Sequence, residues 1–386
     1  MKITTARKRA ILFIVLMGVV SLFADMTYEG ARSITGQYLA ILGASGAVVG
    51  LVAGFGEFIG YGFRLVSGYY SDKTGRYWLF TFIGFFINLL AVPLLALAGN
   101  WSLAASLIIA ERFGKAIRSP SRDAMLSYAT KQTGRGWGFG LHEALDQVGA
   151  IFGPLLVSAV LYYSGSYQMS FAMLLIPALL ALCVLVVARI AMRCPQDLEI
   201  ETPKLQAKGF SRRFWLYIGA VSCIAAGYVD FPLIAYYFKQ TERVSDAWMP
   251  LFFSIAMAFD GISALICGRM YDRLGISVLI GVTIMASLFA PLVFLDGFYF
   301  ALAGMILWGV GLGAQESIMR AVVADLVSTN KRGTGYGFLN IAFGFSWFLG
   351  SALMGFLYDI HLGLLVAFSL VAQLVSIPIL IRIKKL

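Results

Sequence analysis

Residues 68–76 read Gly-Tyr-Tyr-Ser-Asp-Lys-Thr-Gly-Arg and join two long apolar runs. A similar stretch, Gly-Arg-Met-Tyr-Asp-Arg-Leu-Gly-Ile, occupies residues 268–276 and also joins two apolar runs. Counted on the central aspartate, the two copies are offset by 272 − 72 = 200 residues. Similar polar turns at the same place in each half indicate that the chain is built as an internal repeat.

A second match supports the repeat. Residues 135–140, Arg-Gly-Trp-Gly-Phe-Gly, align with residues 332–337, Arg-Gly-Thr-Gly-Tyr-Gly, at an offset of 332 − 135 = 197. With this offset Gly153 falls on Gly350. Corresponding helices are therefore expected at these places in the two halves.

The composition indicates that lipid, rather than water, surrounds most of the chain. Hydrophobic residues make up 60% of the 386 residues and charged residues only 13%, whereas soluble domains carry about 25% charged residues. A membrane-spanning helix needs about 20 apolar residues, so the length allows about a dozen spans and no large soluble domain. The net charge of +10 is explained by basic loops at a membrane, so no nucleic-acid partner is expected.

Apolar runs separated by turn signals predict an all-α polytopic membrane protein with twelve transmembrane helices in two pseudo-symmetric six-helix bundles. The predicted helices cover residues 10–40, 46–71, 77–98, 101–128, 135–163 and 168–192, then 213–239, 247–271, 276–295, 298–326, 333–359 and 363–382. Residues 193–213 form the longest polar stretch and predict a cytoplasmic linker between an N-terminal bundle (1–192) and a C-terminal bundle (214–386).

Basic residues follow the order of the loops. They lie at Lys73 and Arg76, Lys131 and Arg135, the linker, Arg273, Lys331 and Arg332, and 382–385. The intervening loops lack Lys and Arg, except for Lys239 and Arg243. The positive-inside rule therefore predicts an integral plasma-membrane protein, in the inner membrane if the source is bacterial, with both termini cytoplasmic and the first apolar run retained.

The two six-helix repeats and their loop motif resemble the major facilitator superfamily of secondary transporters. The superfamily motif is glycine, three residues, aspartate, a base, any residue, glycine and a base; residues 68–76 match it. The motif continues with a further base, where this chain has Tyr77, and Ile276 replaces the base in the second copy. The resemblance implies alternating access between the two halves.

The resemblance also implies a conformational latch that closes the cytoplasmic side of the outward-open state. Asp72 is expected to cap the eleventh helix, where the helix dipole favours a negative charge, and Arg76 to pair with Asp123. The latch candidates are Gly68, Asp72, Lys73, Gly75, Arg76 and Asp123, with Gly268, Asp272, Arg273 and Gly275 in the second copy.

The fifth predicted helix resembles a pattern associated with antiporters of this superfamily. It contains Gly140, Gly149 and the pair Gly153-Pro154, although Val157 and Ser158 replace the closing glycines. Glycines at 149 and 153 share one helix face and would let another helix approach closely. Both interpretations, antiport and helix packing, remain open at this point.

Charged residues at membrane depth are costly unless they face a protein interior or a cavity. Glu111, Lys115, Arg118 and Arg122 form one stripe on the fourth helix. The substrate-cavity candidates are Tyr28, Arg32, Tyr61, Arg64, Glu111, Arg112, Lys115, Arg118, Asp230, Asp260, Glu316 and Arg320. The alternative is that the acids only neutralise the bases in buried pairs.

A buried carboxyl group without a full partner can bind and release protons. The proton-coupling candidates are Asp25, Glu29, Glu57, Glu143 and Asp146. Asp146 shares a stripe with His142 and the two glycines, which favours a helix interface, so Glu143 is preferred over it.

We therefore expect a secondary transporter of a small organic solute, with proton-coupled antiport (efflux) as the first hypothesis. The alternative is a proton symporter or uniporter that imports an anionic metabolite or a metal chelate such as a siderophore, since the buried bases favour an anionic or zwitterionic substrate. The expected partners are the substrate, protons or another ion, and the lipid bilayer. We expect a monomer without cofactor or metal.

Other classes fit less well. The chain has only two histidines, His142 and His361, and no HExxH, P-loop or serine-elbow motif, so we expect no enzyme. A channel or a transport-inactive sensor is the remaining alternative, because a fold does not itself establish turnover.

Overall fold

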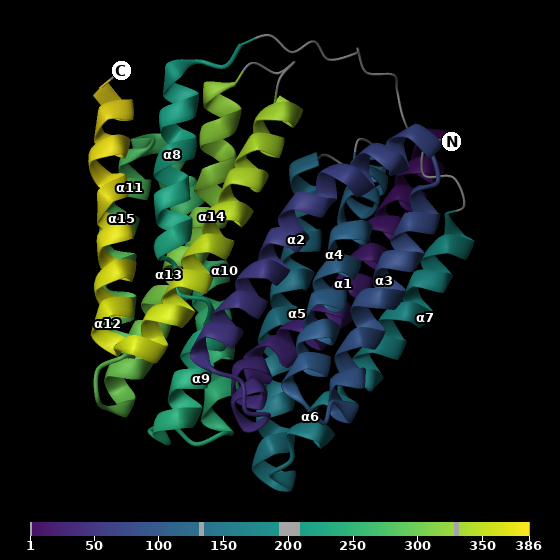
Figure 1. The fold of residues 1–386 in the computed structure, drawn as a ribbon. Coiled ribbons are helices and arrows are strands. Elements are labelled where there is room, and N and C mark those ends of the chain that lie inside the picture. Colours follow the sequence, from purple (N-terminus) through teal and green to yellow (C-terminus); the bar gives the residue numbers. More distant parts are fainter. Residues whose placement is uncertain (1, 131–134, 193–208, 328–331, 386) are drawn as a thin grey trace. The chain divides into compact units, whose positions relative to one another are not determined.

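The computed structural model describes residues 2–130, 135–192, 209–327 and 332–385. Every regular element among these residues is a helix. Most of the predicted linker at 193–213 lies outside the described residues, as do Lys131 and Lys331 of the predicted basic loops. The all-helical fold class predicted from the sequence is confirmed for the described part of the chain (Figure 1).

The first predicted half contains α1 (Lys2–Ile41), α2 (Gly46–Thr74), α3 (Tyr77–Leu94), the 3-10 turn η1 (Leu95–Leu97), α4 (Trp101–Thr130), α5 (Arg135–Ser164), α6 (Tyr167–Met173) and α7 (Leu175–Ala191). The second contains α8 (Arg212–Gly227), α9 (Phe231–Thr241), α10 (Trp248–Leu274), α11 (Ser277–Ala286), α12 (Phe289–Val293), α13 (Phe298–Leu326), α14 (Arg332–Ile360) and α15 (Leu362–Lys385).

The helices account for the twelve predicted spans. Within the described ranges, ten helical stretches are long and apolar enough to cross a membrane. α4 is not among them because it carries six charged residues between Glu111 and Asp123. α11 and α12 together form a shorter apolar stretch, Ser277–Val293. These two additional stretches give 10 + 2 = 12 spans.

Three of the predicted continuous helices are interrupted, which the sequence analysis missed. The sixth is divided into α6 and α7, the seventh into α8 and α9, and the ninth into α11 and α12. At the seventh, the backbone of Tyr228 and Asp230 is extended, with ψ of 109° and 142°. Pro232 then lies in the first turn of α9, where its missing N–H costs little.

By contacts the chain forms two compact units. Unit 1 comprises Met1–Ser33 and Phe63–Pro203, and unit 2 comprises Ile34–Gly62 and Lys204–Leu386. α1 and α2 therefore each contribute one part to either unit. The domain boundary at 193–213 rests on the sequence repeat and stays a prediction.

Both units contain the same close helix contact, at the positions that the repeat predicts. A Cβ atom at Gly153 of α5 would collide with the carbonyl oxygen of Met26 on α1. A Cβ at Gly350 of α14 would collide in the same way with the carbonyl oxygen of Ala226 on α8. The small residues thus bring the two backbones of each pair into direct contact.

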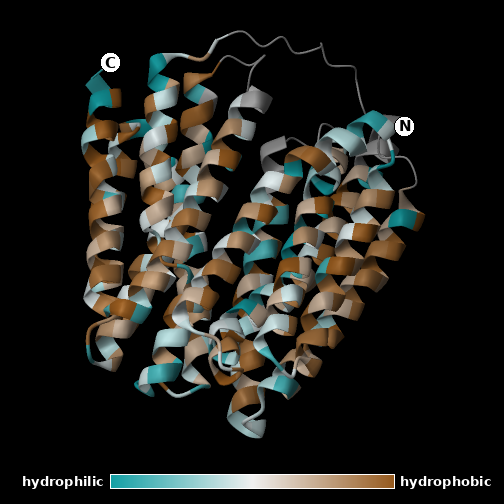
Figure 2. Ribbon diagram, in the orientation of Figure 1, coloured by the Kyte–Doolittle hydropathy of each residue, from teal (hydrophilic) through white to brown (hydrophobic). Residues whose placement is uncertain are grey.

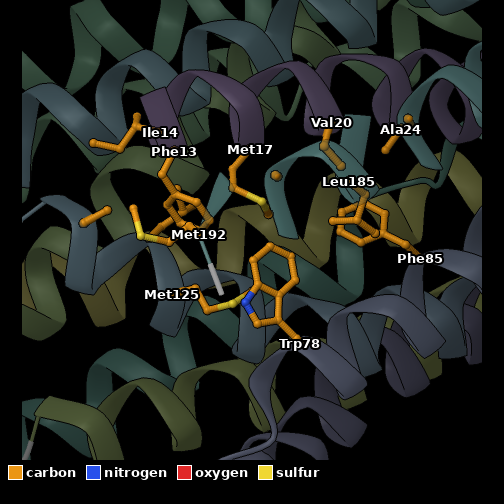
Figure 3. Close-up of a cluster of buried hydrophobic side chains, with 14 of the residues drawn as sticks. Phe13, Ile14, Met17, Val20, Ala24, Trp78, Phe85, Met125, Leu185 and Met192 are labelled. Carbon is orange, nitrogen blue, oxygen red and sulfur yellow. The ribbon is translucent and has the colours of Figure 1, made fainter. Parts of the chain in front are cut away.

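One face of α1 builds the apolar core of unit 1. Phe13, Met17, Val20 and Ala24 recur at helical spacing and are all buried. They pack against α3, α4 and α7, with the Phe13 ring set edge-on to Trp78 at 6.1 Å between centroids (Figure 3). The adjacent face of α1 carries polar residues and is described below.

Large apolar side chains cover the outer surfaces of the helices. Examples are Ile190 (66% exposed), Leu265 (79%) and Val371 (57%). The hydrophobic colouring in Figure 2 extends along most of α7 and α15. Such extensive exposure is expected where lipid is the solvent.

The two bases that break the loop-charge pattern are each placed beside an acid. Lys239 Nζ lies 2.7 Å from Asp246 Oδ2, and Arg243 Nε lies 3.4 Å from Asp296 Oδ1. Their charges are therefore locally balanced, so they add little net positive charge to their loops. The cytoplasmic location of the termini stays a prediction.

The packing of α3 on α4 generates a stability prediction. A Cβ at Gly114 would collide with the backbone nitrogen of Asn88, so Gly114→Ala should overpack this contact and destabilise the protein by about 1–3 kcal/mol. Gly281→Ala is the matched control, because a Cβ at that helical position meets no atom within 4 Å. Thermal unfolding of the purified variants in detergent tests this: an unchanged melting temperature for Gly114→Ala would contradict the contact.

Candidate functional site

A buried polar cluster lies in unit 1, where one face of α1 meets α4 and α5. Ser21, Asp25 and Tyr28 follow each other along α1 at helical spacing and are all buried. Arg118 and Arg122 lie one turn apart on α4, and His142 and Asp146 lie one turn apart on α5. The cluster thus combines residues of three helices, at the depth where membrane proteins place functional charges.

The central acids, Asp25 and Asp146, are only partly satisfied. Asp25 is 6% exposed, and its Oδ1 atom has no hydrogen-bond partner among the described residues. Asp146 Oδ1 is likewise buried without such a partner in the described part of the chain. The charges acting on Asp25 are those of Asp146, Lys115, Arg118 and Glu29. Two acids, Asp146 and Glu29, and two bases, Lys115 and Arg118, therefore surround Asp25.

Two bases stack on aromatic rings in this cluster. Lys115 Nζ lies 3.9 Å from the centroid of the Tyr28 ring, and Arg118 Cζ lies 5.8 Å from the same centroid. The Arg118 guanidinium is also 4.3 Å from the centroid of Phe85. Cation–π contacts of desolvated groups contribute about 2 kcal/mol, which helps to hold these cations in an apolar bundle.

Two other acids are neutralised by adjacent bases. Glu29 Oε2 lies 3.8 Å from Arg32 Nη1. Glu111 Oε2 lies 3.3 Å from Arg112 Nε, and its other oxygen accepts a hydrogen bond of 2.7 Å from Asn88. For these two acids the pairing interpretation accounts for the contacts. The Arg32 contact of Glu29 is too long for a hydrogen bond, so Glu29 Oε2, like one oxygen each of Asp25 and Asp146, has no hydrogen-bond partner among the described residues.

Glycines of α5 allow α1 to approach closely enough for these side chains to meet. Cβ atoms at Gly149 and Gly153 would collide with the carbonyl oxygens of Leu22 and Met26. Pro154 is buried, whereas a Cβ at Gly140 would meet no atom within 4 Å. The structure thus gives Gly149 and Gly153 a packing role at the edge of the polar cluster.

The structure reverses the preference for Glu143 over Asp146. Glu143 is exposed on the surface of α5, one residue away from the face that carries His142 and Asp146. A step of one residue turns a helix by about 100°, so Glu143 points away from the direction of His142. Ser21 had no signal in the sequence, because a serine in an apolar helix is common.

The candidates on α2 divide between the units. Glu57 and Tyr61 are half-buried and belong to unit 2, where the Tyr61 ring lies 5.4 Å from that of Phe343. Arg64 is half-buried and belongs to unit 1. Gly68 faces Pro120 of α4, whose Cβ would lie 3.4 Å from an added Cβ.

The structure does not show the predicted pair between Arg76 and Asp123, which stays a prediction for the outward-open state. Asp123 Oδ1 lies 2.9 Å from Nη2 of the adjacent Arg122, while Arg76 is exposed. Asp72 accepts a hydrogen bond of 3.1 Å from the Tyr77 hydroxyl. Tyr77 stands where the motif has a base, so the departure from the motif supplies the donor to Asp72. Capping of the eleventh helix by Asp72 stays a prediction.

The loop glycines of both motif copies are in the left-handed region, with φ of +65° at Gly75 and +59° at Gly275. Only glycine adopts this conformation without strain, which explains the residue at both turns. Asp272 and Arg273 are exposed, as Lys73 is. A Cβ at Gly268 would lie 3.8 Å from Ser317 of α13.

Unit 2 is richer in aromatic residues around its own buried acid. Trp347 Nε1 donates a hydrogen bond of 3.1 Å to Asp230 Oδ2, at the break between α8 and α9. Trp308 Nε1 donates to the carbonyl of Val229 at 2.9 Å, and the Tyr228 hydroxyl donates to the carbonyl of Trp308. These bonds satisfy polar groups that the interrupted helix exposes.

Two other candidates of unit 2, Asp260 and Glu316, both act on the buried Tyr228. Asp260 is 3% exposed and packs against Gly313 of α13. Glu316 and Arg320 lie exposed on the same helix. Unit 2 therefore has less buried charge than unit 1.

The chain matches the model of the "Major Facilitator Superfamily" over residues 11–351. The chain belongs to the major facilitator superfamily. It is an integral membrane secondary transporter, not an enzyme, and proteins of this superfamily bind small-molecule substrates. The resemblance seen in the loop motif is thereby confirmed at the level of the superfamily.

Relatives extend over nearly the whole transporter. The protein Rv2265 of Mycobacterium tuberculosis is 39% identical over 380 residues, which cover 96% of this chain and 93% of that protein. The MFS-type transporter MJ1317 of Methanocaldococcus jannaschii is 26% identical, with 89% and 88% covered.

Solved structures of other transporters share the fold. A mutant of the nucleoside transporter NupG superposes with a TM-score of 0.77 at 16% identity, covering 95% of this chain and 99% of that chain. A mutant of the peptide transporter POT in complex with sulfate gives 0.75 at 14% identity, with 96% and 95% covered. At these identities the likeness shows the fold alone.

A further contact in unit 2 joins the start of α2 to the end of α14. The Asp359 carboxylate accepts hydrogen bonds of 2.9 Å from the backbone nitrogens of both Gly46 and Ala47. Just beyond, Gly50 and Gly355 bring the two helix backbones together. Asp359 thus caps α2 across a helix crossing, where the dipole favours its charge.

Asp359→Ala should free the first amides of α2 and increase their hydrogen exchange, since loss of a capping carboxylate costs about 1 kcal/mol. Exchange mass spectrometry of peptides covering the start of α2 measures this. Asp272→Ala, which removes an exposed acid elsewhere in unit 2, is the control. Equal exchange in both variants would show that the cap does not stabilise α2.

Proposed function

We propose that this transporter couples proton movement to the transport of a small organic anion, with Asp25 and Asp146 as its proton-binding groups. The observation that carries the proposal is their shared environment: Asp25 is buried and Asp146 half-buried, each has a buried oxygen without a hydrogen-bond partner among the described residues, and Lys115 and Arg118 act on Asp25. Buried acids that are fully paired would have no free acceptor to offer a proton.

Charge balance links protons to an anionic solute. When Asp25 and Asp146 are ionised, they compensate the charges of Lys115 and Arg118. Protonation of either acid leaves a base with an uncompensated positive charge in a medium of low dielectric constant, where an anion is then attracted strongly. Proton binding and anion binding therefore support each other, which favours symport.

Antiport with efflux is the second candidate, and the fifth-helix pattern of Gly149, Gly153 and Pro154 favours it. In that mode the substrate and the proton would compete for the acids, as expected for a cationic or zwitterionic solute. The packing of both glycines on α1 gives the pattern an additional structural reason. The direction of proton flux separates the two modes.

The proposal predicts that Asp146→Asn and Asp25→Asn abolish substrate-driven proton flux, while Glu143→Gln, three residues from Asp146 on α5 but exposed, retains it. The purified protein is reconstituted in liposomes with an internal pH dye, and gradients of a panel of organic anions and cations are imposed. Flux in the direction of an anion supports symport, and flux against the solute supports antiport. An active substrate without proton flux in the wild type would refute proton coupling.

Lys115 is the base that we expect to contact an anionic substrate. Its ammonium group rests on Tyr28 beside the acids, so Lys115→Gln should raise the KM for an anionic substrate about tenfold, equivalent to about 1.4 kcal/mol. Lys115→Arg keeps the charge and the cation–π contact and should raise KM less. Initial rates of uptake into the same liposomes measure both. Equal KM values in the wild type and Lys115→Gln would remove Lys115 from the substrate site.

A further inference from the structure

The cluster continues beyond the two acids as a second polar layer, one helical turn along each helix. On α1 Ser21 precedes Asp25, on α5 His142 precedes Asp146, and on α4 Arg122 follows Arg118. The first residues of α1 and α5 lie at the same side of unit 1 as the last residues of α4. The second polar layer is therefore closer to that side than the first. Asp123, whose side chain is 54% exposed, lies next to this layer.

The hydrogen bonds of the second layer have one direction. Arg122 Nη1 can only donate, so Ser21 Oγ, at 3.2 Å, is the acceptor. The Ser21 hydroxyl can then donate to His142 Nε2 at 3.0 Å. His142 accordingly carries its proton on Nδ1, which lies 3.4 Å from Asp146 Oδ2. The chain runs from the guanidinium through serine and a neutral imidazole to the carboxylate.

We propose that His142 relays protons between Asp146 and the end of unit 1 where Asp123 is exposed, an inference that rests on the proposed proton coupling at Asp146. The Ser21 hydroxyl gives its proton to Nε2 and takes one from water, the proton on Nδ1 passes to the Asp146 carboxylate, and the imidazole is neutral again with its proton on Nε2. Arg122 gives up no proton, since a guanidinium stays charged in proteins. It orients Ser21 and thereby the ring.

The repeat argues that this pair is not needed for packing. With the offset of 197 residues, His142 corresponds to Leu339 (142 + 197) and Asp146 to Phe343 (146 + 197), both buried in unit 2. α14 makes the same close contact with α8 through Gly350 as α5 makes with α1 through Gly153. Apolar residues thus fill the equivalent positions, and buried ion pairs are seldom more stabilising than such residues.

The charged groups around the pair are the ones a relay needs. The positive charges of Arg118 and Arg122 on α4 act on Asp146. The negative charge of Asp146 in turn acts on Asp25 of α1, which is the next proton acceptor.

The tautomer of His142 provides a test that needs no substrate. The full chain has two histidines, His142 and His361, so NMR spectroscopy of isotope-labelled histidine nitrogens, assigned with His361→Gln, reports on His142 alone. We expect the Nδ1–H tautomer in the wild type, because the hydrogen bond from Arg122 leaves Ser21 as the donor to Nε2. In Asp146→Asn the preference for Nδ1–H should be lost. An Nε2–H tautomer in the wild type would overturn the proposal.

Proton flux in liposomes with the internal pH dye tests the relay itself. His142→Gln should slow flux driven by an active compound of the ion panel about a hundredfold, the scale of a lost acid–base group. Ser21→Ala should also slow it, and Ser21→Thr, which keeps the hydroxyl, should restore it. His361→Gln, at an exposed histidine, should match the wild type.

Unchanged flux in His142→Gln would overturn the relay. Failure of the wild type to move protons with any active compound would instead refute the proposed coupling, and the tautomer measurement would still decide whether the hydrogen-bond chain exists. If His142→Gln does not fold, the spectra of the intact protein and the Ser21→Ala and Ser21→Thr pair remain decisive.

Discussion

The burial of charge on α4 is the constraint on which the rest of unit 1 depends. A helix with six charged residues between Glu111 and Asp123 cannot face hydrocarbon, because each exposed charge would cost several kcal/mol. Its charged face must meet polar groups of other helices. Gly114 on α4 and Gly149 and Gly153 on α5 let backbones approach so closely that short side chains from α1, α3 and α5 reach it.

The resulting contacts divide the acids into two kinds. Glu29 and Glu111 each lie against a base of their own helix, Arg32 and Arg112. Asp25 and Asp146 lie where α1, α4 and α5 meet, and each keeps a buried oxygen without a partner among the described residues. Complete pairing stabilises the charged form, whereas incomplete pairing leaves room for a proton. In a transporter, paired acids can stabilise the bundle, and incompletely paired acids can bind protons.

The sequence predicts those features that depend only on helical periodicity or on the length of an apolar run. The spans, the charged stripe of α4 and the glycines at 149 and 153 followed from spacing. The choice between Glu143 and Asp146 did not, because it depends on which face of α5 meets α1. The partner of Asp123 was also missed: an adjacent arginine held by Ser21 can turn toward it, and motif resemblance cannot foresee this local competition. The interruption between α8 and α9 at Asp230 is stabilised by tertiary contacts, such as the hydrogen bond from Trp347, that the sequence does not reveal.

Comparison of the two units separates what the scaffold requires from what the chemistry requires. At the offset of 200 residues Ser21 corresponds to Val221 (21 + 200) and Asp25 to Ala225 (25 + 200), and both apolar residues are fully buried. The helix contact beside them is the same in both units. The backbone arrangement therefore forms without polar groups at these places, and their presence in unit 1 must be explained by what they bind. Buried charge among the described residues is therefore concentrated in unit 1, whereas the interior of unit 2 is mainly aromatic and satisfies its polar groups through hydrogen bonds such as that from Trp347 to Asp230.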